Sequence, residues 1–290
     1  MHHYSIADIN ICVLWENEEK KNKYYRYHDC IVLPRALEAF HKDEPKEEAD
    51  MKVLVRALGK YSGPEKCKKL YNQSFYQKND KMIITVYDPY CEEEAGYSIA
   101  MAKDYSYVEF TPHKEEYEHY DLQWMMYPFE GRMLYKGGIV LHGAAVECNG
   151  KGIIFTGISG AGKSTQAHLW QKYKDALIIN GDCPSIKMVD GLPIVYGTPW
   201  CGTAGESINR KVRLCAVVLV KQGEKNTLKE FKGQAAFVMI LTNVLRSNFD
   251  ESALDLSCEN LKNIMEHIRV FEITCTVSEE AVKILEKELA

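Results

Sequence analysis

Hydrophobic and polar residues follow strand and helix periods most clearly in the second half of the chain. Two apolar or alternating runs, Ile139 to Glu147 and Lys151 to Thr156, are joined at Asn149-Gly150. An Asn-Gly pair between two such runs is the strongest short-range signal for a β-hairpin. The pattern therefore predicts a hairpin whose second strand leads directly into a glycine-rich segment that begins at Gly157.

Strands and helices alternate after this glycine-rich segment. Ser164 to Lys172 has helical spacing, Ala176 to Asn180 is a short buried strand, and Asp190-Gly191 joins a second predicted hairpin. Further strands are expected at Leu214 to Lys221 and Val270 to Thr276, and further helices at Gln234 to Arg246, Ala253 to His267 and Ser278 to Leu289. Such alternation is typical of an α/β fold.

The first part of the chain has a different pattern. Strand-like runs at Ile9 to Trp15, Lys81 to Tyr87 and Tyr105 to Thr111 are separated by charged segments. Asp121 to Tyr135 has apolar residues close to helical spacing, and Pro128 should kink or interrupt that helix. This part is therefore expected to be mixed and mainly β.

Together these patterns predict a mixed α/β (α+β) chain with two parts. We expect an accessory or recognition part over residues 1–120 and a catalytic domain over residues 121–290. A chain of 290 residues with 46% hydrophobic residues is long enough for two cores. The first part holds 14 of the 18 tyrosines, which fits either a recognition surface or ordinary packing between strands.

Composition and charge exclude several classes of function. The net charge is only −5, and the longest apolar runs, such as Leu214 to Val220, are far shorter than the roughly 20 residues of a membrane-spanning helix. We therefore expect no nucleic-acid partner and no membrane. The ten cysteines form no CxxC pair and no cluster with histidine, so neither a zinc site nor a disulfide framework is predicted. Without a secretory signal at the N-terminus, a cytoplasmic location fits best.

The glycine-rich segment carries the strongest chemical signal. Gly157 to Ser164 matches the pattern GxxxxGK followed by Ser or Thr, between a predicted strand and a predicted helix. In this motif backbone N–H groups surround phosphate oxygens, the lysine reaches the β- and γ-phosphates, and the hydroxyl binds magnesium. The predicted ATP-binding residues are Gly157, Ile158, Ser159, Gly160, Ala161, Gly162, Lys163, Ser164 and Thr165, with Mg²⁺ as the second cofactor.

A carboxylate follows the next predicted strand. Asp182 lies 19 residues after Lys163 and just beyond the strand that ends at Asn180, where open α/β sheets place their sites. It can hold magnesium or accept the proton of an attacking hydroxyl. The alternative is an Asx-turn or N-cap aspartate ahead of Pro184.

Other candidates depend more heavily on context. His142, inside a predicted strand, could be a phosphate or base partner, although a lone histidine there is more often structural. The loop Thr198 to Glu206 could supply a second metal ligand through Glu206, or it could be a solvated loop. Arg210, Arg213 and Arg246 are candidate cations for the γ-phosphate, and Arg246 could equally complement a helix dipole.

The order of these motifs resembles a known family. Leu141-His142-Gly143-Ala144-Ala145-Val146, the glycine-rich segment and Asn180-Gly181-Asp182 are similar to the catalytic domain of HPr kinase/phosphorylase, whose core is related to phosphoenolpyruvate carboxykinases. The resemblance covers about residues 138–220. It implies that His142 is an active-site residue, that Ser164 binds magnesium and that Asp182 accepts the proton of the substrate hydroxyl. Where that family often has two consecutive aspartates, this chain has Gly181-Asp182.

These residues predict an ATP-dependent kinase in which Asp182 and Lys163 are catalytic and His142 assists. Its acceptor would be a serine-type hydroxyl on a protein, a peptide or a metabolite. The alternatives are a nucleotide-binding regulatory module without catalysis and, less favoured by the motifs, a phosphoenolpyruvate carboxykinase. A homo-oligomer is compatible with the sequence, which does not decide the oligomeric state.

Overall fold

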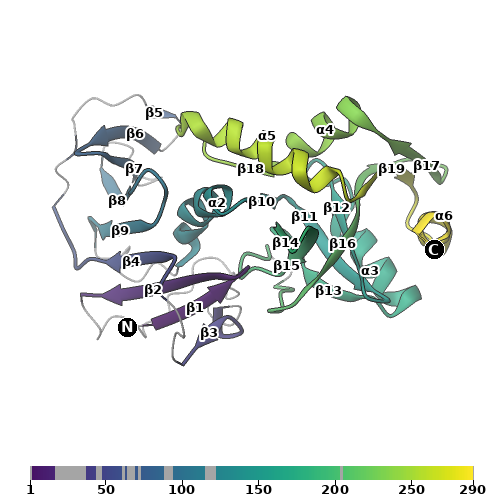
Figure 1. The fold of residues 1–290 in the computed structure, drawn as a ribbon, viewed down its shortest axis with the longest axis horizontal. Helices are drawn as coiled ribbons and strands as arrows, with labels where there is room; N and C mark the ends of the chain where they lie inside the picture. The colour runs from purple at the N-terminus through teal and green to yellow at the C-terminus, as the bar shows by residue number, and fades with distance from the viewer. Residues whose placement is uncertain are drawn as a thin grey trace. The chain divides into compact units, whose positions relative to one another are not determined.

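The computed structural model of the chain describes residues 2–16, 37–43, 48–60, 63, 69–70, 73–87, 94–114, 122–202 and 205–289. It divides into two compact units, Met1–Arg132 and Met133–Ala290 (Figure 1). The expected boundary at residue 120 lies outside the described residues. Two large mixed sheets with accompanying helices confirm the predicted mixed α/β class.

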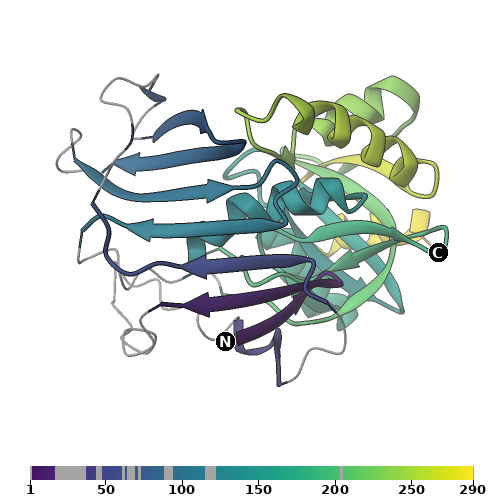
Figure 2. The ribbon, with the colours of Figure 1, turned by 60° about the vertical axis from the view of Figure 1, so that its left-hand side comes forward.

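The described strands of the first unit form one nine-stranded sheet, seen in Figure 2. Its order is β3-β1-β2-β4-β9-β8-β7-β6-β5, and the pairs β2/β4 and β4/β9 are parallel. The strands are β1 His2–Ile6, β2 Ile9–Trp15, β3 His41–Lys42, β4 Met51–Val55, β5 Lys69–Leu70, β6 Gln73–Lys78, β7 Lys81–Tyr87, β8 Ala95–Met101 and β9 Tyr107–Pro112. The expected strands near residues 9, 81 and 105 are therefore confirmed, the last with shifted ends.

One face of this sheet is apolar because successive strand residues point to opposite sides. Ile84, Ile99 and Phe110 stand in register on neighbouring strands and are fully buried. Trp124 stacks on Phe110 with ring centroids 4.4 Å apart. Trp124 belongs to η3 (Leu122–Met125), which is followed by α2 (Met126–Tyr135). Pro128 therefore lies in the first turn of α2, where its missing N–H costs no helical hydrogen bond.

The second unit is built on a ten-stranded sheet. Its main path is β13-β11-β12-β16-β15-β14-β10-β18, and β19 joins β16 and β17. The strands are β10 Gly138–Leu141, β11 Gly143–Cys148, β12 Lys151–Thr156, β13 Leu177–Asn180, β14 Ser185–Val189, β15 Leu192–Tyr196, β16 Lys211–Gln222, β17 Thr227–Phe231, β18 Val244–Leu245 and β19 Arg269–Cys275. The helices are α3 Lys163–Lys174, α4 Gly233–Leu241, α5 Glu251–Met265 and α6 Glu279–Leu289.

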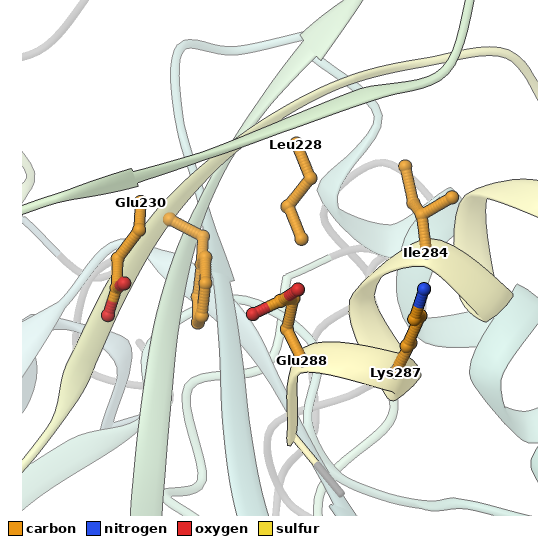
Figure 3. A pocket seen from close by; sticks show the side chains of 6 residues that line it. Leu228, Glu230, Ile284, Lys287 and Glu288 are labelled. Atoms are coloured by element: carbon orange, nitrogen blue, oxygen red, sulfur yellow. The ribbon is translucent and has the colours of Figure 1, made fainter.

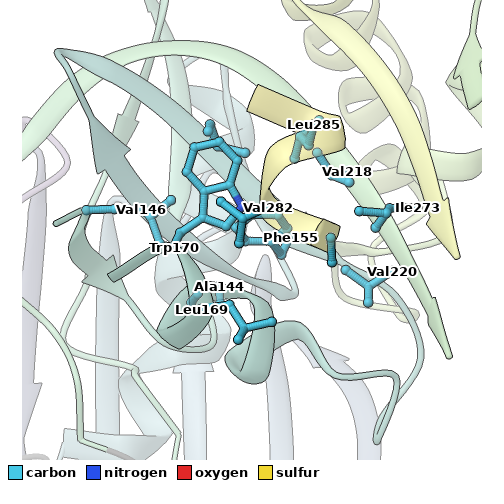
Figure 4. Packing of buried hydrophobic residues seen from close by; sticks show 14 of the residues in the cluster. Ala144, Val146, Phe155, Leu169, Trp170, Val218, Val220, Ile273, Val282 and Leu285 are labelled. Atoms are coloured by element: carbon cyan, nitrogen blue, oxygen red, sulfur yellow. The ribbon is translucent and has the colours of Figure 1, made fainter. Parts of the chain in front are cut away.

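Two apolar clusters cover the two faces of this sheet. Neighbouring residues such as Ile154 and Phe155 belong to different clusters, as the alternation of side chains along a strand requires. The Phe155 cluster includes residues of α3 and α6, with Trp170 and Leu285 among them (Figure 4). The Ile154 cluster includes residues of α4 and α5. The sheet is thus enclosed between helices, as in other α/β folds.

The local turn signals are confirmed and two element limits are wrong. Asn149 and Gly150 have φ of 51° and 74°, and Asp190 and Gly191 have φ of 49° and 74°, as tight hairpin turns require. The expected single strand Ile139 to Glu147 is broken at His142, because β10 pairs with β14 and β18 while β11 pairs with β12 and β13. The helix expected as far as Arg246 ends at Leu241, since the chain then pairs with β10 as β18.

Candidate functional site

The glycine-rich loop connects β12 to α3. Gly157, Gly160 and Gly162 have φ of 144°, 78° and 102°, a region that side chains disfavour. A Cβ at Gly157 would also lie 3.0 Å from Val220 O. Glycines here let the backbone turn sharply at the end of the buried strand β12. The loop then leads directly into the N-terminus of α3.

Lys163 lies inside this loop. Its Nζ donates to Gly157 O and Ile158 O at 3.1 and 3.2 Å, and the residue is only 8% exposed. Burial lowers the pKa of Lys163, while the nearby Asp182 carboxylate acts in the opposite direction. The loop therefore holds a partly desolvated ammonium group, which an anionic ligand would stabilise.

The first turn of α3 presents further polar groups. Gly162 is the N-cap and provides no side-chain hydrogen bond to the helix. Ser164 and Thr165 are exposed. A helix of this length with uncapped N–H groups favours an anion at its N-terminus, so the backbone, Lys163 and these hydroxyls together can bind phosphate groups.

Asp182 lies shortly after the end of β13 at Asn180, within electrostatic reach of Lys163. Its Oδ1 is 3.4 Å from His142 Nε2, and both side chains are a little over one third exposed. Backbone contacts hold the two segments together, because Gly143 N donates to Asp182 O at 2.7 Å. The structure thus brings together three of the predicted residues, Lys163, Asp182 and His142.

The break between β10 and β11 places His142 at this site. His142 N donates to Asn243 O at 2.9 Å, and His142 O accepts from Thr156 Oγ1 at 2.7 Å. Burial lowers the pKa of His142, as does the positive charge of Lys163, and Asp182 opposes both. The neutral imidazole is therefore favoured at neutral pH.

Glu206 lies next to the Asp182 segment, and its carboxylate is engaged. Its Oε1 is 2.9 Å from Nε2 of His168 on α3, while its backbone oxygen accepts from Gly181 N at 2.9 Å. A Cβ at Gly181 would lie 3.1 Å from Cys201 O and 3.7 Å from Glu206 Cβ. A side chain at position 181 would thus pack tightly against the loop after β15, which would have to shift slightly.

Arg210 and Arg213 lie away from the glycine-rich loop, and Arg246 donates to backbone carbonyls. Arg210 pairs with Glu147, which stands opposite Gly152 at the start of β12. Arg213 stands next to Ile194, near the same end of the sheet. The glycine-rich loop leaves the opposite end of β12. Arg246 donates to Leu241 O and Val244 O. Leu241 is the last residue of α4, so these bonds fit the alternative role of Arg246 as a charge at a helix end.

Sequence reasoning missed several residues that contact the site. Gln222 Nε2 donates to Gly160 O at the tip of the loop at 2.7 Å, although 62 residues separate them. Asn180 and Thr198 are fully buried polar residues that bond to the backbone of Asp182 and Cys183. A buried polar residue at a strand end was the available signal for Asn180, but its partner could not be read from the sequence.

Side chains with oxygen donors of the kind that magnesium binds are present at this site. The described residues contain no cluster of three or more His, Cys, Asp and Glu side chains that could hold a metal. Magnesium does not need one, because it usually takes one or two protein oxygens and completes its shell with phosphates and water. Ser164 and Asp182 offer such oxygens, whereas Glu206 would first have to leave His168.

A separate cavity of about 380 Å³ lies between β17, β19 and α6 (Figure 3). It is lined by Leu228, Phe271, Ile284 and charged residues. Its two glutamates, Glu230 and Glu288, both pair with Arg269. None of the residues of the glycine-rich loop lines this cavity, so the cavity is separate from the candidate site at the loop.

The helices of the described residues were also compared with the length and hydrophobicity of a membrane span. None of them meets both requirements.

Comparisons relate the chain to known proteins. The model of one family, described as SynChlorMet cassette protein ScmC, matches residues 109–282. No curated protein matches the chain. Among solved structures, the Hpr(Ser) kinase/phosphatase from Coxiella burnetii is 11% identical with a TM-score of 0.31, over 52% of this chain and 97% of that chain. The properties of the site therefore rest on its own geometry.

Proposed function

The chain belongs to the family of SynChlorMet cassette protein ScmC, and we propose that it is an ATP-dependent kinase that transfers the γ-phosphate to a hydroxyl group. One observation carries the proposal. A desolvated lysine in a glycine-rich loop lies within electrostatic reach of Asp182, which also contacts His142. Phosphoryl transfer needs a cation on the phosphates and a carboxylate that orients or deprotonates the nucleophile.

In this proposal the backbone of Gly157 to Gly162 and the N-terminus of α3 hold the ATP phosphates. Lys163 exchanges its two carbonyl acceptors for phosphate oxygens and neutralises charge on the transferred group. Ser164 would hold the magnesium ion, assisted by Asp182 directly or through water. Magnesium, when bound, would offset the negative charge of the phosphates.

Asp182 receives the proton of the acceptor hydroxyl as that oxygen attacks the γ-phosphorus. The bond between the γ-phosphorus and the bridging oxygen breaks, and ADP leaves with the electron pair. His142, neutral at pH 7, contacts Oδ1 and keeps the carboxylate turned toward the reaction centre. Positioning supplies most of the rate.

The test compares wild type with Asp182→Asn and with Asp190→Asn. Asp190 occupies a positive-φ hairpin turn that asparagine tolerates, so its variant is a matched control. Each protein is given γ-labelled Mg-ATP with protein, peptide and small-molecule fractions of a soluble extract. We expect label in one fraction with wild type and the control, and a loss of about 10²–10⁴-fold with Asp182→Asn.

Tight ATP binding by all three proteins without transfer would contradict the kinase proposal. It would favour a nucleotide-dependent regulatory module, for which Gly181 in place of a second carboxylate is the motivating observation. If Asp182→Asn leaves transfer unaffected, Asp182 is not the base, and the proposed kinase activity itself still stands.

A further inference from the structure

Asn180 makes an unusual number of contacts for one side chain. It is fully buried at the end of β13. Its Oδ1 accepts from the backbone N–H groups of Asp182 and Cys183, at 3.0 and 2.7 Å. Its Nδ2 donates to Thr198 O at 2.8 Å and, at 3.3 Å, to Thr198 Oγ1 and Trp200 O. One amide therefore connects two loops.

Thr198 completes the connection from the other side. It is also fully buried, and its Oγ1 donates to Cys183 O at 2.7 Å. The amide N–H of Cys183 is thus held by Asn180 and its carbonyl by Thr198. We call these two side chains, Asn180 and Thr198, the loop clasp.

The loop clasp sets what surrounds the Asp182 carboxylate. Cys183 Sγ lies 3.4 Å from Asp182 Oδ2. On the other loop, a Cβ on Gly202 would lie 3.2 Å from Asp182 Cβ, so the glycine backbone, with φ of 68°, packs closely against the aspartate. The loop clasp holds the backbone of Cys183 beside Asp182, and it fixes the position of the Gly202 loop relative to the Asp182 loop.

We propose that Asn180 and Thr198 are positioning residues for the phosphoryl-transfer reaction, acting through the orientation of Asp182. The inference rests on the proposed kinase function and adds residues outside the glycine-rich loop. Neither side chain has a hydrogen bond to the glycine-rich loop in the described residues. Loss of the loop clasp should therefore reduce transfer without weakening nucleotide binding.

The first experiment uses Thr198→Val and Thr198→Ser. Valine keeps the shape and removes the hydroxyl, whereas serine keeps the hydroxyl that donates to Cys183 O. We expect Thr198→Val to lower kcat by about tenfold or more, because small misplacements of reacting groups are costly. The Kd of ATP should stay at the wild-type value, and Thr198→Ser should restore most of the rate.

The second experiment uses Asn180→Ala and the double variant with Thr198→Val. Because the two side chains act through one pair of loops, the double variant should lose less than the product of the single losses. Independent, multiplicative losses would contradict a shared clasp. A parallel fall in kcat and ATP affinity, or an unchanged kcat, would overturn the positioning role.

Hydrogen exchange separates failure of this inference from failure of the kinase proposal. Asn180→Ala should speed exchange of the amides of Asp182 and Cys183, which lose their acceptor. The amides of Ala161 and Gln166, bonded to Ile158 O and Gly162 O, should remain unchanged. If wild type transfers no phosphate, this selective change still supports the loop clasp, and equal exchange in both proteins rejects it.

Discussion

Two histidines, one in each unit, illustrate how similar residues acquire different roles. In the first unit, His113 Nδ1 lies 2.8 Å from Gly59 O, and its Nε2 lies 2.8 Å from Ser98 Oγ. In the second unit, the ring of His142 has one polar contact among the described residues: its Nε2 lies 3.4 Å from Asp182 Oδ1. Burial lowers the pKa of both.

The difference lies in what completes their hydrogen bonding. The two ring nitrogens of His113 are satisfied by the protein itself, so His113 ties Gly59 to Ser98. His142 keeps bonding capacity beside a carboxylate and the buried Lys163. A satisfied histidine stabilises the fold, whereas an incompletely bonded one beside opposite charges is available to a ligand.

Among the variants that test this comparison, the largest effect should come from His142→Ala. We expect a loss of transfer of about a hundredfold, at the lower end of the range for acid–base groups, because Asp182 loses the neighbour at Oδ1. The free energy of unfolding should change little, since the ring makes no hydrogen bond within the described part of the chain. Initial rates of label transfer and urea unfolding of the same variant give the two values. A destabilised variant with full activity would reverse the comparison.

His113→Ala should show the opposite combination. It leaves Gly59 O and Ser98 Oγ without the ring, at a cost of about 1–3 kcal/mol for the partly buried groups. Transfer at saturating ATP should stay at the wild-type rate. Chemical denaturation measured beside kcat decides this, and a large kcat loss with unchanged stability would show that His113 belongs to the reaction.

A pH effect on stability should come from Glu130 on α2. Burial raises the pKa of Glu130 to about 8, above its ordinary value of 4.5, so the folded state binds more protons than the unfolded state between these values. Stability should fall as pH rises through this window, by up to about 1.4 kcal/mol per pH unit from this group. In Glu130→Gln this contribution should be absent. Unfolding free energies at pH 5, 6.5 and 8 test it, and an unchanged slope would refute it.

The smallest effect should come from Arg210→Gln. Arg210 is exposed and pairs with Glu147 at the end of the sheet remote from the glycine-rich loop. Exposed ion pairs contribute little, so kcat and ATP affinity should match wild type. A strong loss of transfer would return Arg210 to the list of phosphate-binding candidates.

The sequence predicted those parts of the fold that depend on neighbouring residues. Asn149-Gly150 and Asp190-Gly191 specify tight turns by themselves, and Gly157 to Ser164 specifies a strand, a loop and a helix in order. The break at His142 was not predicted, because the apolar run resumes directly after His142-Gly143. Only the change of partners, from β14 and β18 to β12 and β13, divides the strand.

The site shows the same limit. Lys163, Asp182 and His142 could be named from motif order and strand ends. The contacts of Asn180 with Thr198 and of Gln222 with Gly160 span 18 and 62 residues, and no local pattern encodes such pairs. Glu206 was expected to bind metal, but its contact with His168 depends on how the loop after β15 folds onto α3.

The central claim is that one site binds ATP through Lys163 and needs Asp182 chiefly for the transfer step. The most direct test measures the Kd of Mg-ATP and the rate of γ-phosphate transfer on the same preparations of wild type and Asp182→Asn. For the variant we predict a transfer rate at least a hundredfold lower and a much smaller change in the Kd of Mg-ATP. Equal transfer rates, or no ATP binding by wild type, would contradict the account.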